Sequence, residues 1–132
     1  MKTVHTPLII LLLAMMGVPG IAAAQSGGIQ SIDAASFRRQ LDADPQAILL
    51  DVRTRSEFEE GHLPGAIHID VLQADFESAV QDLDLTKPMY VYCLAGQRSM
   101  RAAQILRSKH ATQLYNLRGG IRSWKAHSFP IE

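Results

Sequence analysis

The chain has 132 residues, a length that fits one domain, and its 13 basic and 13 acidic residues give a formal net charge of zero. This balance argues against nucleic-acid binding, which usually needs a basic surface. The hydrophobic content of 47 % is ordinary for a globular protein, although the N-terminal segment raises it.

The N-terminus has the pattern of a secretory signal peptide. Lys2 gives it a weakly positive start, and residues 8–16 form an uninterrupted apolar run. The segment 17–20 contains two glycines and a proline, and the alanines at 22–24 are the small residues that signal peptidase accepts. The apolar run is shorter than the ~20 residues of a membrane span. We therefore expect a signal peptide over 1–24, cleaved after Ala24, rather than an uncleaved membrane anchor.

Cleavage would give a periplasmic protein with no membrane association. Because Lys2 is the only charged residue removed, the mature chain would have 12 basic against 13 acidic residues and a net charge of −1. Residues 25–30 are predicted to be a flexible N-terminus, and residues 31–132 to form one folded domain.

Helix-capping residues mark the first two predicted helices. Asp33 is a suitable N-cap for an amphipathic helix over 34–41. Thr54 and Glu57 fit a capping box, and Gly61 follows as a stop signal, so a short helix is expected between them.

Strands alternate with these and later helices. The expected strands are 47–50, 66–69, 89–92 and 113–117, and the further helices are about 72–83, 99–109 and a short one containing Trp124. This order predicts a single-domain α/β fold, a mostly parallel central sheet with helices on both faces. Ligands of such sheets bind beyond the carboxyl ends of the strands, where Asp51 and Cys93 are predicted to lie.

Cys93 is the only cysteine of the chain, so it cannot form an internal disulfide. In an exported protein, a leftover cysteine indicates a reactive thiol or an intermolecular bond, and a buried structural thiol is the alternative. A short loop follows Cys93, and a helix is expected from about Ser99. The N–H groups of such a loop and helix start can converge on a negative charge, which lowers a cysteine pKa from ~8.5 toward ~3.5–7.5. Gly96 allows the positive φ that closes the loop.

Two cations accompany this loop. Arg98 and Arg101 lie near the expected helix start, where a cation opposes the helix dipole at a cost of ~0.3–1 kcal/mol. A bound anion would reverse this penalty, whereas side chains that turn outward would lose little. We expect Arg98 to face the loop and leave both possibilities open for Arg101.

Three segments together resemble the rhodanese family. They are the loop over 93–99, an upstream stretch over 50–53 and 57–67 that includes a Gly-His-Leu-Pro-Gly-Ala-Ile run, and a downstream Gly-Gly-helix-Trp stretch over 117–124. The resemblance extends from about residue 31 to 129. A short domain behind a signal peptide is similar to the small periplasmic phage-shock type of sulfurtransferase.

The resemblance implies thiosulfate sulfurtransferase activity through a Cys93 persulfide, with a small-molecule sulfur donor, a thiol or cyanide as acceptor and a protein as a further acceptor. It implies no metal and no organic cofactor. Cys93 would be the nucleophile. The residues expected to bind the substrate are those of the loop: Leu94, Ala95, Gly96, Gln97, Arg98 and Ser99.

Two other functions remain as alternatives. One is a persulfide carrier or relay module for a protein partner. The other is a phosphatase or arsenate reductase of the same fold, for which five residues usually separate the cysteine from the arginine, whereas four separate Cys93 from Arg98. Asp51 and Arg53 are interpreted as scaffold, and His62 and His68 lack partners at metal-ligand spacing.

Overall fold

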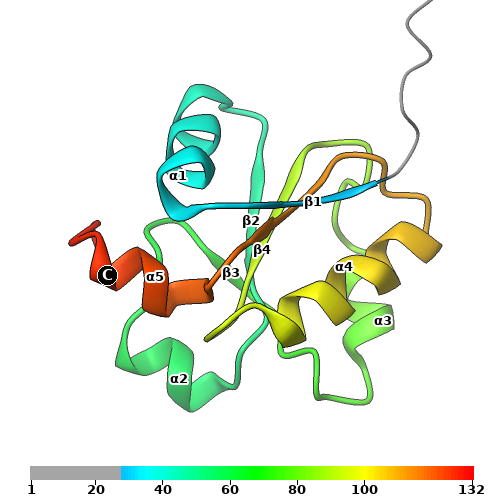
Figure 1. Cartoon of the computed structure of the whole chain (residues 1–132). Coiled ribbons are helices and arrows are strands. Elements are labelled where there is room, and N and C mark those ends of the chain that lie inside the picture. Colours follow the sequence, from blue (N-terminus) through cyan, green and yellow to red (C-terminus); the bar gives the residue numbers. More distant parts are fainter. Residues whose placement is uncertain (1–27) are drawn as a thin grey trace, which may run out of the picture.

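Five short strands form one sheet in the part of the chain that the computed structural model describes, residues 28–132 (Figure 1). The predicted signal peptide lies outside these residues. The strands are β1 (Ile29–Ile32), β2 (Ile48–Asp51), β3 (Ile67–His68), β4 (Met89–Tyr92) and β5 (Leu114–Leu117). Their order across the sheet is β1-β5-β4-β2-β3, and every neighbouring pair is parallel. The predicted α/β fold is confirmed.

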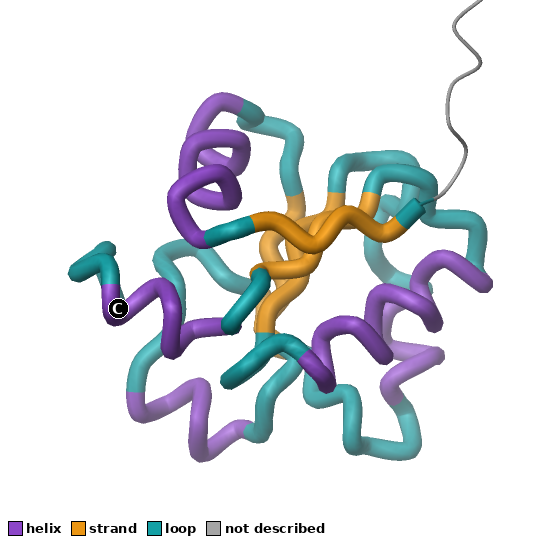
Figure 2. Tube along the Cα trace, in the orientation of Figure 1, coloured by secondary structure: helices purple, strands orange, loops and turns teal. Residues whose placement is uncertain are grey.

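Helices cover both faces of the sheet (Figure 2). The helices are α1 (Ala34–Ala43), α2 (Arg55–Glu60), α3 (Phe76–Val80), α4 (Gln97–Ser108) and α5 (Gly120–Ala126). Successive side chains of a strand point to opposite faces, so Met89 and Val91 of β4 pack with α3 and α4, whereas Tyr90 and Tyr92 pack with α1 and α5. Among residues 28–132, none of the helices has the length and apolar character needed to span a bilayer.

The predicted starts of the first two helices are confirmed. The Asp33 carboxylate accepts a hydrogen bond from the Ser36 N–H at 2.8 Å and caps α1. At α2, the Glu57 N–H donates to the Thr54 hydroxyl and the Thr54 N–H donates to the Glu57 carboxylate, each at 3.3 Å, which completes the capping box. Gly61 ends α2 with φ +151°.

The first strand and the third helix differ from the prediction. Ile29 and Gln30 belong to β1, which pairs with β5, whereas a flexible segment was expected over 25–30. An edge strand of four residues beside glycines has too weak an alternating pattern to be recognised. The helix expected over 72–83 is reduced to α3, because the Asp70 carboxylate accepts a hydrogen bond from the Leu72 N–H at 2.9 Å and holds a turn before it.

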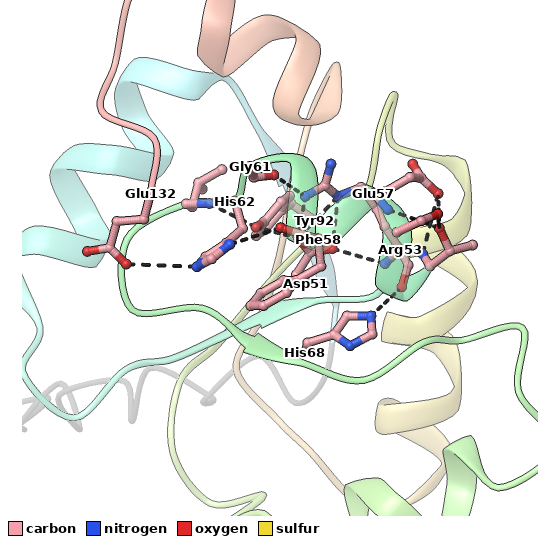
Figure 3. A network of polar contacts seen from close by, with 12 residues as sticks. Asp51, Arg53, Glu57, Phe58, Gly61, His62, His68, Tyr92 and Glu132 are labelled. Atoms are coloured by element: carbon pink, nitrogen blue, oxygen red, sulfur yellow. Dashed lines mark hydrogen bonds and ion pairs between the residues drawn. The ribbon is translucent and has the colours of Figure 1, made fainter.

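A buried ion pair lies at the carboxyl end of β2 (Figure 3). The Asp51 side chain is fully buried and that of Arg53 nearly so, and the Arg53 Nη2 and Asp51 Oδ2 atoms are 2.6 Å apart. The Tyr92 hydroxyl donates to the same Oδ2 at 2.6 Å. The carboxylate accepts hydrogen bonds from four groups, which are the Arg53 backbone N–H, Nε and Nη2 and the Tyr92 hydroxyl, and these bonds offset the cost of burying its charge. The interpretation of Asp51 and Arg53 as scaffold fits these contacts.

The same network fixes the chain that leaves α2. Arg53 Nη2 donates to the Gly61 carbonyl at 2.8 Å, and the Leu63 N–H donates to the Tyr92 hydroxyl at 3.0 Å. His68 Nε2 lies 2.7 Å from the Arg53 carbonyl, which can only accept, so this nitrogen carries the proton. The short β3 and the end of α2 are therefore held to the sheet by polar contacts as well as by packing.

The start of α5 approaches the loop after β4 very closely. Gly119 and Gly120 have φ of +77° and +60°. A Cβ on Gly120 would lie 2.3 Å from the Leu94 carbonyl group. This closeness lets the Ile121 N–H donate to the Cys93 carbonyl at 2.9 Å and the Arg122 N–H to the Leu94 carbonyl at 3.2 Å. Because it lacks a Cβ, Gly120 therefore allows α5 to bind the loop.

Replacing Asp51 by asparagine should destabilise the domain by about 3–5 kcal/mol, the usual effect of removing one partner of a buried pair. Asn has nearly the same shape, but its amide cannot balance the Arg53 charge. Urea unfolding measures the loss. The control is Glu59→Gln, because the Arg55–Glu59 pair is 3.7 Å long with side chains 77 % and 64 % exposed. That change should alter stability by less than ~1 kcal/mol. Similar losses in both variants would contradict the role assigned to Asp51.

Gly120→Ala should lower the free energy of unfolding by well over the ~1–2 kcal/mol that a left-handed backbone costs a residue with a Cβ. The added methyl group would overlap the Leu94 carbonyl and push α5 from the loop. Gly65→Ala is the matched control, because Gly65 has φ +79° but no atom within 4 Å of the added Cβ. Equal losses for the two variants would show that backbone strain alone, and not the close approach, makes Gly120 necessary.

Candidate functional site

Cys93 lies directly after β4, at the carboxyl edge of the sheet where the sequence placed it. Cys93 is 1 % exposed. Helix α4 begins four residues later, and its N-cap Gly96 has φ +113°. This angle confirms the expectation for Gly96. Because α4 starts at Gln97 rather than at Ser99, the loop that encloses the sulfur is shorter than expected.

Hydrogen-bond donors surround the Cys93 sulfur. The Gly96 N–H donates to Sγ at 3.1 Å, and the Ser99 hydroxyl oxygen lies 3.2 Å from Sγ. Burial raises the pKa of the Cys93 thiol, but hydrogen bonds from the Ser99 hydroxyl and from the N–H groups of Ser99, Gly96 and Ala95 outweigh it. The thiol pKa is therefore lower than usual, which favours the nucleophilic thiolate.

The contacts with α5 determine the direction of the Leu94 and Ala95 N–H groups in the loop. Ile121 and Arg122 bind the carbonyl oxygens of Cys93 and Leu94 on the outer side of the loop. In a planar trans peptide the C=O and the following N–H point in opposite directions. The N–H groups of Leu94 and Ala95 therefore point away from α5, toward the side on which the sulfur lies.

Arg98 makes an ion pair that the sequence did not reveal. Its Nη1 and Nη2 donate to the two carboxylate oxygens of Glu57 at 2.7 and 2.9 Å. Hydrogen bonds from the Arg98 side chain are the main reason why the pKa of Glu57 falls to about 2. Glu57 had been recognised only as part of the capping box. Its carboxylate joins α2 to α4 beside the loop, and the Cys93 charge contributes to raising the Arg98 pKa.

The other predicted residues are distributed around Cys93. Leu94, Ala95 and Gly96 are half-buried in the loop, Gln97 is exposed and Ser99 is buried. Arg101 is exposed on α4. Asp51 and Arg53 contact Tyr92, Gly61 and each other rather than the sulfur. One further polar residue, Asn116 of β5, joins the site, because the Ser99 hydroxyl donates to its Oδ1 at 2.6 Å.

Two hollows lie near this edge of the sheet, and neither is lined by Cys93. One, of about 430 Å³, borders the loop on the side of β1 and β5 and includes Ala95, Gln97 and Asn116 in its lining. The other, of about 400 Å³, is polar and includes Arg55, His68 and Asp70. Within residues 28–132, no three His, Cys, Asp or Glu side chains are placed to hold a metal ion.

Several known proteins are similar to this chain in sequence. The chain is 43 % identical over 79 residues to the uncharacterized protein YqhL of Bacillus subtilis, a match that covers 60 % of the chain but only 61 % of YqhL. It is 35 % identical over 80 residues to the thiosulfate sulfurtransferase GlpE of Coxiella burnetii, covering 61 % of the chain and 73 % of GlpE.

The fold agrees with this relationship. The structure of the human single-domain sulfurtransferase TSTD1 superposes with a TM-score of 0.66 and 29 % identity, covering 75 % of the chain and 97 % of TSTD1. The protein-family model for the rhodanese-like domain matches residues 33–127 of the sequence. This range includes the Cys93 loop, Glu57, Gly119 and Gly120. The chain therefore belongs to the rhodanese family, as its loop and its two flanking segments had indicated.

Proposed function

We propose that the protein is a sulfurtransferase that moves the outer sulfur of thiosulfate to a thiophilic acceptor through a Cys93 persulfide. The observation that carries the proposal is a single, buried thiol whose sulfur accepts hydrogen bonds from the loop between β4 and α4. The relatives include proteins named thiosulfate sulfurtransferase and sulfurtransferase, which supports sulfur transfer as the reaction class.

The reaction has two half-reactions. The Cys93 thiolate attacks the outer sulfur of thiosulfate, the S–S bond of thiosulfate breaks, and sulfite leaves with the electron pair. Cyanide or a thiolate then attacks the terminal sulfur of the persulfide, and Cys93 leaves as thiolate. The attacking form is the thiolate, and the lowered pKa of Cys93 increases the share of the protein that carries it.

The loop suits this intermediate. A persulfide carries its negative charge on the terminal sulfur, about 2.0 Å beyond Sγ. The N–H groups of Leu94 and Ala95 face the inner side of the loop, where they can donate to that sulfur. The loop residues Leu94 to Ser99 are therefore proposed as the binding site of the donor and of the transferred sulfur.

Arg98 is proposed to contact the anionic donor while paired with Glu57. The two charges nearly cancel, so an approaching thiosulfate must share the guanidinium with the Glu57 carboxylate. This competition would keep the donor affinity moderate and let sulfite leave after the first half-reaction. A planar guanidinium can serve both anions at once, whereas an ammonium group presents no comparable fork.

A carrier role is the alternative. One relative is named a putative sulfur carrier protein, and the chain spans 52 % of its length at 29 % identity. A carrier would receive sulfur on Cys93 from a protein and would not react with thiosulfate.

We also propose that the protein is exported to the periplasm, with residues 1–24 removed. The support is the apolar run over 8–16 followed by the alanines at 22–24.

Incubating the purified protein with thiosulfate, without acceptor, should add the mass of one sulfur atom to Cys93, as measured by intact-protein mass spectrometry. Cyanide should then restore the original mass and yield thiocyanate. Cys93→Ser, nearly isosteric, should show neither step while keeping its circular dichroism spectrum.

Loading by a persulfide donor protein but not by thiosulfate would favour the carrier role instead. Hydrolysis of an aryl phosphate by the wild type, lost in Cys93→Ser, would point to phosphatase chemistry and contradict the proposal.

Arg98→Ala should raise the KM for thiosulfate about tenfold or more, since a hydrogen bond to a charged group contributes ~1.5–3 kcal/mol. Arg98→Lys should be milder. Glu57→Gln should lower the KM, because it frees the guanidinium. Steady-state thiocyanate formation measures all three. An unchanged kcat/KM for thiosulfate in Arg98→Ala would remove Arg98 from the donor site.

Expression of the full chain in a Gram-negative host should place the protein in the periplasmic fraction. N-terminal sequencing of that material should begin at Gln25, directly after the alanines at 22–24. Ala24→Arg puts a large charged residue where signal peptidase needs a small one and should block cleavage. Recovery of wild-type protein with Met1 intact on membranes would refute the export proposal.

A further inference from the structure

Asn116 is a buried polar residue that the reaction as described above does not use. It lies on β5 opposite Val91 of β4, and it is 3 % exposed. Its side chain spans the space between Ser99 of α4 and Ser31 of β1. The sulfur of Cys93 lies one hydrogen bond farther on, beyond the Ser99 hydroxyl.

The contacts determine the orientation of the Asn116 amide. Nδ2 lies 3.4 Å from the Gly96 carbonyl oxygen, which can only accept, and 2.9 Å from the Ser31 hydroxyl. A flipped amide would place two acceptors against each other. Oδ1 therefore faces Ser99, and because Oδ1 can only accept, the 2.6 Å contact requires the Ser99 hydroxyl to donate.

The Ser99 hydroxyl has one proton and two neighbouring acceptors. When Cys93 is a thiol, its S–H can donate to the Ser99 oxygen while Ser99 donates to Asn116, and every group has a partner. When Cys93 is a thiolate, its sulfur has no proton to donate. It then attracts the proton of the Ser99 hydroxyl, whose oxygen lies 3.2 Å away. If the Ser99 hydroxyl rotates to donate to the sulfur, the buried Asn116 Oδ1 loses its donor, which is unfavourable.

We propose that Asn116 is a positioning residue that competes with the Cys93 sulfur for the Ser99 proton and so limits the stabilisation of the thiolate. The inference rests on the proposed function, in which that thiolate is the nucleophile. The backbone N–H groups supply donors to the thiolate in both arrangements. Ser99 supplies a further donor only when the hydroxyl turns away from Asn116.

This competition bears on both half-reactions. A thiolate with a lower pKa is intrinsically less nucleophilic but leaves more readily, with a Brønsted coefficient of about 0.4–0.5 for attack on sulfur. A thiolate fully hydrogen-bonded by Ser99 would thus attack thiosulfate more slowly, by about threefold for each pKa unit. Because Asn116 competes for the Ser99 proton, Ser99 stabilises the thiolate only in part, and the sulfur keeps more of its reactivity.

The experiment measures the thiol pKa directly. Because Cys93 is the only cysteine, the ultraviolet absorbance of the thiolate and the pH dependence of alkylation by iodoacetamide report this residue alone. Asn116→Leu, close in shape but unable to accept, should lower the thiol pKa. Ser99→Ala should raise it. In the Ser99→Ala background, adding Asn116→Leu should not lower the thiol pKa.

Ser31→Ala is the matched control, because it removes the other partner of the Asn116 amide without touching the Ser99 contact. It should leave the thiol pKa unchanged. A thiol pKa that is unchanged or raised in Asn116→Leu, or lowered equally with and without the Ser99 hydroxyl, would overturn the proposal.

If Asn116→Leu does not fold, Asn116→Asp tests the competition for the Ser99 proton instead. A carboxylate accepts the Ser99 proton more strongly, so the thiol pKa should rise, and the rise should be smaller in the Ser99→Ala background, where only the added charge acts. An equal rise in both backgrounds would reject the competition. These pKa measurements need no sulfur donor, so their failure would leave persulfide formation standing, and a failure to form persulfide would leave the competition standing.

Discussion

The binding of the loop carbonyls by the first N–H groups of α5 is the contact on which the rest of the site depends. The Ile121 N–H and the Arg122 N–H bind the carbonyls of Cys93 and Leu94, and Gly120 makes the approach possible by lacking a Cβ. With those carbonyls engaged outside, the next N–H groups face inward. Backbone N–H groups therefore supply part of the electrostatic environment of the sulfur, and the Ser99 hydroxyl supplies another part.

A second set of contacts holds the opposite side of the site. Asp51 and Arg53 neutralise each other inside the protein and fix the end of α2 through the Gly61 carbonyl. α2 in turn carries Glu57, which holds the Arg98 guanidinium. Figure 3 shows this polar network around Asp51, Arg53 and Tyr92, with Glu57 at its margin. Charged residues of the segment from β2 to α2 therefore help to hold the Arg98 guanidinium beside the loop.

The sequence revealed features whose partners are near in the chain. The caps at Asp33 and Thr54 and the positive φ of Gly96 depend on neighbours within a few residues. The roles of Glu57 and Asn116 escaped it, because Glu57 meets Arg98 across 41 residues and Asn116 meets Ser99 across 17. A glutamate in a helix start and an asparagine in a strand have common local explanations, and only the folded chain brings their partners to them.

The burial of Cys93 has a consequence for selectivity between sulfur species. A disulfide needs Cβ atoms about 3.5–4.5 Å apart, so a cysteine that is 1 % exposed cannot be joined to a second protein chain without opening its loop. A slender anion that presents one terminal sulfur demands far less room. In the proposed persulfide, the outer sulfur stands about one S–S bond, ~2.0 Å, beyond Sγ. Under the proposed mechanism, burial thereby shields the free thiol from cross-linking, while the persulfide extends its outer sulfur beyond the position that the thiol occupies.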